Sequence, residues 1–366
     1  MNQQTYLPIF ELVRNGVVES THFGAIAVAD VHGNLIASYG DPHAVAFLRS
    51  SAKPIQAIAL IENGGIPRYN LTQEEIAIIC ASHHGTDNHF EVLNRLQNKV
   101  GIREADLLCG VHAPGDPATA DALRKRGDKP TPNRHNCSGN HTGILAFTRL
   151  MAGTPGWDTG NLPYTDARHP AQQYLLDTFA GMCGISSFEV ATGIDGCSIL
   201  TFAVPLLKAA RAYARLCDPT ELKLKKAEAC RAITSSMAAY PEMVGGPNSF
   251  DTHIMHSTRG RIISKGGAEG YQAMGLPPGT LGLSSPAVGI TIKISDGDLA
   301  SHFLLPKEYG GHARTAVALE VLRQLGVLTT DELTSLADFG PTFPLTNYLT
   351  IETGYGRPCF SLFRPD

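Results

Sequence analysis

The hydrophobic pattern of the first forty residues is that of extended chain. The segments GAIAVAD (24–30) and LIASYG (35–40) are rich in apolar residues and flank the turn-forming residues VHGN. Two short apolar runs around such a turn are typical of a β-hairpin. The sequence therefore predicts strands near the start of the chain.

The pattern becomes helical after residue 51. The segment SAKPIQAIALIENGG (51–65) carries apolar residues three or four positions apart and ends at paired glycines, which is typical of an amphipathic helix. In LTQEEIAIIC (71–80), Thr72 and Glu75 form the signature of a capping box. Further helices are expected at 87–99, 140–152, 165–180 and 219–237, with an interruption at 188–204 where strand-forming residues surround a glycine-rich turn.

Extended patterns return after residue 260, in RGRIISKGG (259–267), AVGITIKISDGD (287–298) and NYLTIETGYG (347–356), with one helix over 312–326. Strands at both ends with helices between them predict a mixed α/β (α+β) fold. We expect an antiparallel sheet built from about 1–50 and 260–366, and a helical region over about 51–240. Length alone would also allow two domains, but no long linker separates any segment, so a single domain over 1–366 is predicted.

Charge and hydropathy exclude several classes of partner. Thirty basic and thirty-four acidic residues give a net charge of −4, without a long basic run, so neither nucleic acid nor an anionic membrane surface is an expected partner. The opening residues lack the pattern of a signal peptide, and no apolar segment nears the ~18 residues of a membrane span. The eight cysteines are scattered, as expected for buried thiols in a reducing compartment. We therefore expect a cytoplasmic protein.

A serine and a lysine open the helix predicted after residue 51. Ser50 and Lys53 are three positions apart, so both side chains would project from one face of its first turn. A buried lysine favours its neutral amine, which can take the proton of a serine nucleophile. In the alternative interpretation Ser50 or Ser51 caps the helix, Lys53 is solvated, and Pro54 takes an early helical position. Because a chain this long contains about one such spacing by chance, the motif alone favours the alternative.

Two later segments carry a second serine and a second lysine. Ser82 follows an apolar helix in ICASHHGTDNH (79–89), and Lys265 lies where a predicted strand enters a glycine turn in IISKGGAEG (262–270). The second segment is similar to the late Lys-[Ser/Thr]-Gly element of Ser-x-x-Lys acyl enzymes, with Gly266 in place of the hydroxyl residue. Separately, each segment is equally compatible with a solvated loop or a surface lysine. Together with the sheet–helix–sheet order, they indicate the serine β-lactamase and penicillin-binding fold class.

Two cysteines lie in tight turns. Cys137 is part of RHNCSGNHTG (134–143), and Cys197 is part of GIDGCS (193–198). Both segments are also compatible with turns that have no further role.

The ordered motifs of the chain resemble those of a known family. The runs VES.HFG, SSAKP.Q, ASHHG, NCSGNHTG, HP.QQ, GIDGC and KGGAEG are similar to the L-asparaginase II family, typified by the rhizobial enzymes, from about residue 6 to the C-terminus. The resemblance implies a serine β-lactamase-like fold, hydrolysis of the L-asparagine side-chain amide, a homodimer, two Ser–Lys pairs and a nearby zinc site.

The resemblance also implies roles for the hydroxyl and lysine residues. Ser50 matches the nucleophile and Lys53 its base. Ser82 and Lys265 match the second Ser–Lys pair, which would relay protons or favour the neutral form of Lys53 through like-charge repulsion. The expected reaction is an acyl-enzyme hydrolysis that needs no cofactor for its chemistry.

The zinc site implied by the resemblance differs from the pattern of the family at one position. Cys137 and Cys197 match the thiolate ligands, but Asn140 stands where zinc-binding members carry a lysine as third ligand. An amide is a poor zinc ligand beside two thiolates. Either His141 or another histidine such as His112 replaces it, or the metal is weak or absent.

Recognition of a free amino acid needs partners for its two charged groups. Arg49 is expected to bind the α-carboxylate and Asp195 the α-ammonium, because both charges lie beside the motifs. Alternatively, Arg49 only neighbours the helix cap and Asp195 only forms a turn. Two other functions stay open: hydrolysis of another small amide, such as glutamine or a lactam, and non-catalytic binding of an amino acid.

Overall fold

The computed structural model describes residues 5–298 and 312–365. The chain divides into two compact units. We call one the sheet unit, which comprises Met1–Ser51, Val204–Asp218 and His253–Asp366, and the other the helical unit, which comprises Ala52–Ala203 and Pro219–Thr252. The single catalytic domain expected from the sequence stays a prediction.

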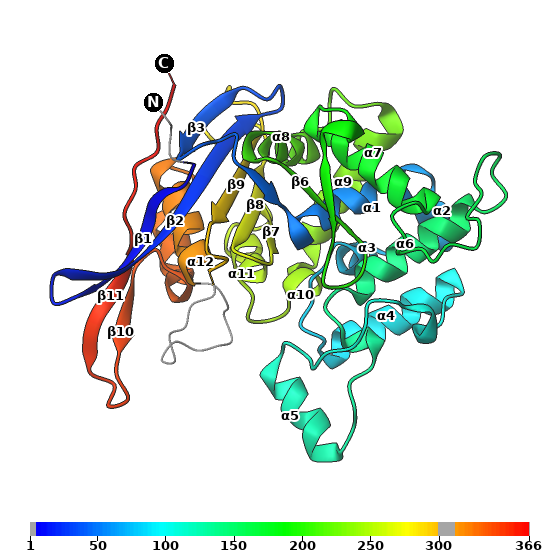
Figure 1. Cartoon of the computed structure of the whole chain (residues 1–366), viewed down its shortest axis with the longest axis horizontal. Helices are drawn as coiled ribbons and strands as arrows, with labels where there is room; N and C mark the ends of the chain where they lie inside the picture. The colour runs from blue at the N-terminus through cyan, green and yellow to red at the C-terminus, as the bar shows by residue number, and fades with distance from the viewer. Residues whose placement is uncertain (1–4, 299–311, 366) are drawn as a thin grey trace. The chain divides into compact units, whose positions relative to one another are not determined.

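The sheet unit contains an antiparallel sheet with the strand order β10-β11-β1-β2-β9-β8-β7, to which β3 is added beside β2. Figure 1 shows that strands from the beginning of the chain, in blue, lie beside strands from its end. This confirms the predicted mixed fold, with an antiparallel sheet built from both chain ends. The strands are β1 Leu7–Arg14, β2 Val17–Asp30, β3 Leu35–Tyr39, β7 Ile263–Gly267, β8 Tyr271–Leu276, β9 Val288–Ile294, β10 Phe343–Thr346 and β11 Glu352–Pro358.

Helices cover both faces of this sheet. On one face, α8 (Leu206–Cys217) lies so close to β8 and β9 that a Cβ at Gly275 or Gly289 would collide with its backbone. On the other face, α12 (His312–Gln324) places Arg314 Nη1 2.9 Å from Gln272 Oε1. Because side chains alternate along a strand, Gln272 and Gly275 point to opposite faces. The remaining elements within or entering this unit are β4 Val45–Phe47, η1 Arg49–Ala52, α11 Phe250–Ser257, α13 Thr330–Ser335 and η6 Ala337–Phe339.

The helical unit is built around α1 (Lys53–Glu62), whose residues are buried except Glu62. It packs against α6, α7 and α9. The predicted capping box at the start of α3 is present, because Thr72 Oγ1 accepts from Glu75 N at 3.3 Å and Glu75 Oε2 accepts from Thr72 N at 2.8 Å. The other elements are α2 Gly65–Tyr69, α3 Gln73–Ile79, α4 Asp87–Val100, η2 Glu104–Asp106, α5 Pro117–Arg126, η3 Pro132–Arg134, α6 Ser138–Met151, α7 Pro170–Cys183, η4 Ser187–Glu189, β5 Ala191–Ile194, β6 Leu200–Pro205, α9 Leu224–Ala239 and α10 Pro241–Gly245.

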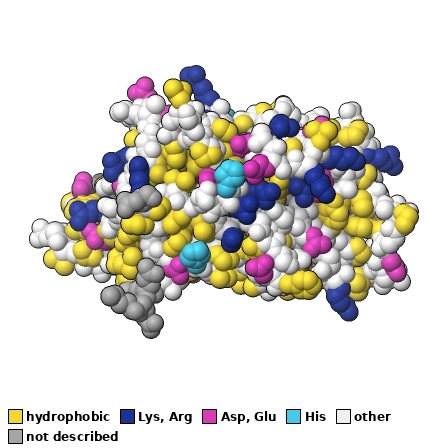
Figure 2. All heavy atoms as spheres, turned by 90° about the horizontal axis from the view of Figure 1, so that it is seen from above, with side chains coloured by type: hydrophobic (Ala, Val, Ile, Leu, Met, Phe, Trp, Pro, Cys, Tyr) yellow, Lys and Arg dark blue, Asp and Glu magenta, His cyan; other side chains and the backbone are white. Residues whose placement is uncertain are grey.

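The exposed surface carries charges of both signs. Figure 2 shows Lys and Arg side chains and Asp and Glu side chains distributed over one face, in agreement with the small net charge of −4. Within residues 5–298 and 312–365, none of the helices combines the length and the hydrophobicity that crossing a bilayer requires.

Candidate functional site

The segment with the Ser-x-x-Lys motif folds as two consecutive helical pieces. The 3₁₀ helix η1 holds Ser50, which is half-buried, and leads directly into α1, which begins at Lys53. The residue at the cap position of α1 is Ala52, so no side chain caps the helix there. Lys53 is only 3% exposed. Neither serine therefore acts as the cap of α1, and Lys53 is buried rather than solvated.

The turn that carries Ser50 is docked on the edge strand β7. Ser51 Oγ donates to the backbone oxygen of Lys265 at 2.7 Å, and Tyr213 of α8 donates its hydroxyl proton to the backbone oxygen of Ser51 at 2.7 Å. A Cβ at Gly267 would collide with the backbone oxygen of Leu48, so only glycine allows this close approach. The backbone beside Ser50 is thus fixed to the strand that carries Lys265.

Lys265 is 1% exposed and lies within β7. Its Nζ donates to the backbone oxygen of Gly266 at 2.8 Å. At Gly266, where the Lys-[Ser/Thr]-Gly element has a hydroxyl residue, a Cβ would meet the guanidinium of Arg314 from α12, the far end of a flexible side chain.

Arg49 adopts a left-handed backbone conformation, with φ 52°. Its guanidinium Nη1 lies 3.8 Å from the carboxylate Oε1 of Glu269, in the turn between β7 and β8. Glu269 belongs to the KGGAEG run, in which only Lys265 is expected to have a catalytic role. The contact joins positions 220 apart in the chain, and no local sequence signal marks it.

In the helical unit, Lys53 is surrounded by three hydrogen-bond acceptors. Its Nζ lies 2.8 Å from the backbone oxygen of Ala81, 3.1 Å from Ser82 Oγ and 3.1 Å from Cys137 Sγ. A lysine ammonium has three N–H donors, so these contacts account for all of them. The structure therefore brings together Lys53, Ser82 and Cys137, which are far apart in the sequence.

A buried histidine fixes the backbone that follows Ser82. His83 Nε2 lies 2.9 Å from Ser138 Oγ, and its Nδ1 accepts from Gly85 N at 3.1 Å. Burial holds the pKa of His83 well below its usual value, and the neighbouring His89 and Lys53 lower it further. His83 is therefore neutral and acts here as a structural hydrogen-bonding group.

The two predicted zinc thiolates interact with each other. A hydrogen bond from Cys197 lowers the pKa of Cys137 well below its usual value, against the effect of burial, and nearby Lys53 lowers it further. The same hydrogen bond and burial raise the pKa of Cys197. The hydrogen bond between the two thiols thus shifts their pKa values in opposite directions.

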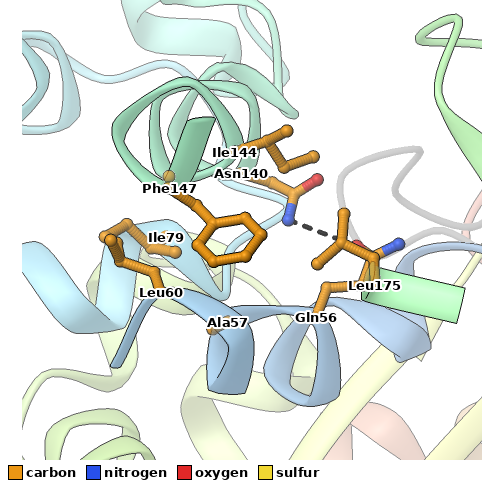
Figure 3. Close-up of a pocket in the computed structure, with 9 residues that line it drawn as sticks. Gln56, Ala57, Leu60, Ile79, Asn140, Ile144, Phe147 and Leu175 are labelled. Carbon is orange, nitrogen blue, oxygen red and sulfur yellow. Dashed lines mark hydrogen bonds between the residues drawn. The ribbon is translucent and has the colours of Figure 1, made fainter. Parts of the chain in front are cut away.

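Asn140, His141 and His112 each make other hydrogen bonds, although Asn140 Oδ1 and His141 Nε2 are buried without a hydrogen-bond partner among the described residues. Asn140 Nδ2 donates to Gln56 Oε1 at 3.2 Å (Figure 3). His141 Nδ1 lies 2.7 Å from the hydroxyl of Tyr164, and burial lowers the pKa of His141 to about 4. His112 bonds to the backbone of Asn136 and of Ala113.

Nowhere in the described part of the chain do three His, Cys, Asp or Glu side chains form a group that could hold a metal ion. The predicted set Cys137, Cys197 and His141 is thus not assembled as a ligand group, and the amide at Asn140 is a poor zinc ligand. The zinc site implied by the resemblance is therefore not supported by these contacts, and the proposed reaction uses only side chains and backbone groups of the protein.

A small cavity lies beside Asn140. Apolar side chains from α1, α3, α6 and α7 form most of its wall, and Phe147 and Leu60 lie on one side of it (Figure 3). Its volume of about 10 Å³ leaves room for roughly one water molecule. The cavity is therefore too small for an amino acid.

Asp195 lies in the turn between β5 and β6. Its Oδ1 accepts from Gly196 N at 2.6 Å, and its backbone oxygen accepts from Ser198 N at 2.9 Å. These bonds show a turn-forming role for Asp195, and its role in substrate binding stays a prediction.

The mixed α/β fold places the buried Lys53 beside the Ser82 hydroxyl, and a serine beside a basic group is the arrangement that nucleophilic acyl transfer uses. The family described as L-asparaginase II matches residues 10–356. The chain belongs to the L-asparaginase II family and is an amidohydrolase of amino-acid amides.

Several solved structures are similar to the chain at low identity. One is a Bacillus subtilis glutaminase in covalent complex with 5-oxo-L-norleucine, with 13% identity, 83% of this chain and 88% of that chain covered, and a TM-score of 0.37. Another is a probable glutaminase from Bacillus subtilis complexed with 6-diazo-5-oxo-L-norleucine, with 14% identity, coverage of 85% and 87%, and a TM-score of 0.37. No curated protein matches the chain.

Proposed function

We propose that the protein hydrolyses the side-chain amide of L-asparagine and releases L-aspartate and ammonia through an acyl-enzyme on Ser50. The observation that carries the proposal is Lys53, which is buried at the start of α1 with its Nζ 3.1 Å from Ser82 Oγ. In a chain of the L-asparaginase II family, this is the arrangement expected for a lysine that exchanges protons with a serine hydroxyl.

In the proposed reaction, Ser50 Oγ attacks the amide carbon of asparagine. Lys53 takes the hydroxyl proton and returns it to the leaving nitrogen, so that ammonia departs. Water then attacks the ester on Ser50, which releases aspartate and restores the hydroxyl. Backbone N–H groups at Ser50 and in the glycine turn after Lys265 would stabilise the oxyanion.

The remaining residues support this step. Ser82, which is hydrogen-bonded to Lys53, and Lys265 form the proposed second pair and relay protons. Arg49 binds the α-carboxylate of the substrate, since a guanidinium matches a carboxylate in charge and shape. The homodimer and the cytoplasmic location expected from the sequence stay predictions.

The test of this function is ammonia release by the purified protein from L-asparagine, L-glutamine and a chromogenic β-lactam. We expect the highest kcat/KM with L-asparagine. Preference for glutamine or the lactam would assign the same machinery to another amide. A thermal shift with asparagine that is not followed by ammonia release would identify a binding protein instead of an enzyme.

A further inference from the structure

Arg49 and Glu269 face each other from two left-handed backbone positions. Their φ angles are 52° and 60°, a region that residues with a Cβ rarely adopt, apart from asparagine and aspartate. Backbone preference therefore does not explain an arginine and a glutamate at these positions. Such outliers occur preferentially where side chains serve a site, so the two side chains themselves need an explanation.

The two charges are close but are not joined by a hydrogen bond. Arg49 Nη1 and Glu269 Oε1 are 3.8 Å apart, beyond the ~3.2 Å limit of a good N–H···O bond. The Glu269 side chain is 55% exposed and that of Arg49 is 23% exposed. The Glu269 carboxylate thus keeps capacity to accept hydrogen bonds from a ligand that arrives from solvent.

Arg49 and Glu269 lie on the two segments of the sheet unit that contain the proposed catalytic residues Ser50 and Lys265. Arg49 immediately precedes Ser50, and Glu269 follows Lys265 by four positions. The bond of 2.7 Å between Ser51 Oγ and the backbone oxygen of Lys265 ties these two segments together. A ligand held by Arg49 and Glu269 is therefore placed next to both segments.

The turn that presents Glu269 is itself fixed. Lys293 of β9 donates from its Nζ to the backbone oxygen of Glu269 and, at 2.8 Å, to the backbone oxygen of Ile294. Gly270, the next residue, also has a positive φ of 68°. The carboxylate of Glu269 is thus carried by an anchored turn at the end of the sheet.

A zwitterionic α-amino acid carries an ammonium and a carboxylate on the same carbon atom. A protein guanidinium and a protein carboxylate a few ångströms apart offer the opposite charges in the same spacing. We infer that Arg49 and Glu269 form the binding site for the head group of an α-amino acid, in which Glu269 accepts hydrogen bonds from the α-ammonium. This inference rests on the proposed function and identifies Glu269 as the residue that selects substrates with an α-amino group.

The inference can be tested by binding, without turnover. Isothermal titration would compare L-aspartate, the expected product, with succinate, which differs by the absence of the amino group. Glu269→Gln should weaken the binding of L-aspartate by roughly tenfold or more, as expected for the loss of a charged hydrogen bond. The affinity for succinate should stay within about twofold of the wild type.

Two further variants complete the design. Glu19→Gln is the matched control, because Glu19 also pairs with an arginine, Arg14 at 2.9 Å, and its side chain is 50% exposed. It should leave both affinities unchanged. Asp195→Asn tests the other carboxylate that the sequence suggests, and it should not weaken L-aspartate selectively. Circular dichroism would establish that each variant is folded.

Three results would overturn the inference. Equal losses of L-aspartate and succinate in Glu269→Gln would mean that Glu269 acts only by positioning Arg49. A selective loss of L-aspartate in Asp195→Asn, with Glu269→Gln unchanged, would assign the ammonium to Asp195. Absence of L-aspartate binding to the wild type would also contradict it. A wild type that binds L-aspartate through Glu269 but releases no ammonia would refute the proposed hydrolysis and leave this inference intact.

Discussion

The Nζ of the buried Lys53 lies 3.1 Å from the hydroxyl oxygen of Ser82, a partly exposed residue of the helical unit. This contact joins the lysine of the Ser-x-x-Lys motif to the serine of a segment almost thirty residues later. Because the backbone oxygen of Ala81 and the sulfur of Cys137 take the other donors of Lys53, the amine has a fixed position.

The first prediction distinguishes the catalytic roles of Ser50 and Ser82. Ser50→Ala should lower kcat for ammonia release from asparagine by at least about a thousandfold, because the nucleophile is lost. Ser82→Ala should cause a smaller loss, since it removes only a partner of Lys53. Both rates would be measured with circular dichroism as a folding control. If Ser50→Ala stays active and Ser82→Ala is inactive, the two roles are exchanged.

The elements with strong local signals were predictable from the sequence. The capping box at Thr72 and Glu75 marks the start of α3, and the helix expected over 312–326 is observed at His312–Gln324. By contrast, the sequence did not predict α8. This helix follows β6 directly and has Pro205 at its cap position without a side-chain cap, so the usual start signal of a helix is missing.

Of the candidate site, only the residues that lie in short sequence motifs were predictable. Ser50, Lys53, Ser82 and Lys265 stand in recognisable short patterns, whereas Ser51 and Glu269 gain their contacts only when η1 docks on β7. These contacts depend on sheet topology rather than on local periodicity. A single sequence contains no signal for a contact between positions more than two hundred residues apart.

The second prediction concerns the docking of η1. Ser51→Ala removes the hydrogen bond of 2.7 Å to the backbone oxygen of Lys265 and should lower the free energy of unfolding by about 1–3 kcal/mol, because a buried acceptor loses its donor. Urea unfolding would measure the loss. Ser235→Ala is the control, because the Ser235 hydroxyl is exposed and donates to the nearby backbone oxygen of Ala232, and it should change stability by less than about 0.5 kcal/mol. Equal stabilities of both variants would contradict the docking role.

The third prediction concerns zinc. Ammonia release should survive treatment with a strong chelator, because Cys137 Sγ already accepts from Lys53 Nζ at 3.1 Å and is hydrogen-bonded to Cys197. The measurement is elemental analysis of the treated protein together with its activity. One zinc per chain, with activity that is lost on removal and restored on addition, would show that Cys137 and Cys197 bind a metal.

The fourth prediction is a loss of stability in acid that arises from buried neutral histidines. Burial lowers the pKa of His89 to about 4, whereas an unfolded histidine has a pKa near ~6.5. Between these values the unfolded chain binds a proton that the folded protein excludes. The contribution of His89 is therefore intact above pH ~6.5 and is lost as the pH falls toward 4, by up to roughly 3 kcal/mol.

His89→Gln provides the test of this last prediction. The variant should be less stable than the wild type at pH 7.5, because His89 Nε2 donates to the backbone oxygen of Glu242 at 2.8 Å and its Nδ1 accepts from Thr86 N at 3.1 Å. Its stability should nevertheless fall less steeply between pH 6.5 and 4, since glutamine binds no proton in either state. Urea unfolding at pH 7.5, 6 and 5 measures both slopes. Parallel slopes for the two proteins would mean that His89 is not a source of the acid sensitivity, and the same series with His83→Gln would then examine the second buried imidazole.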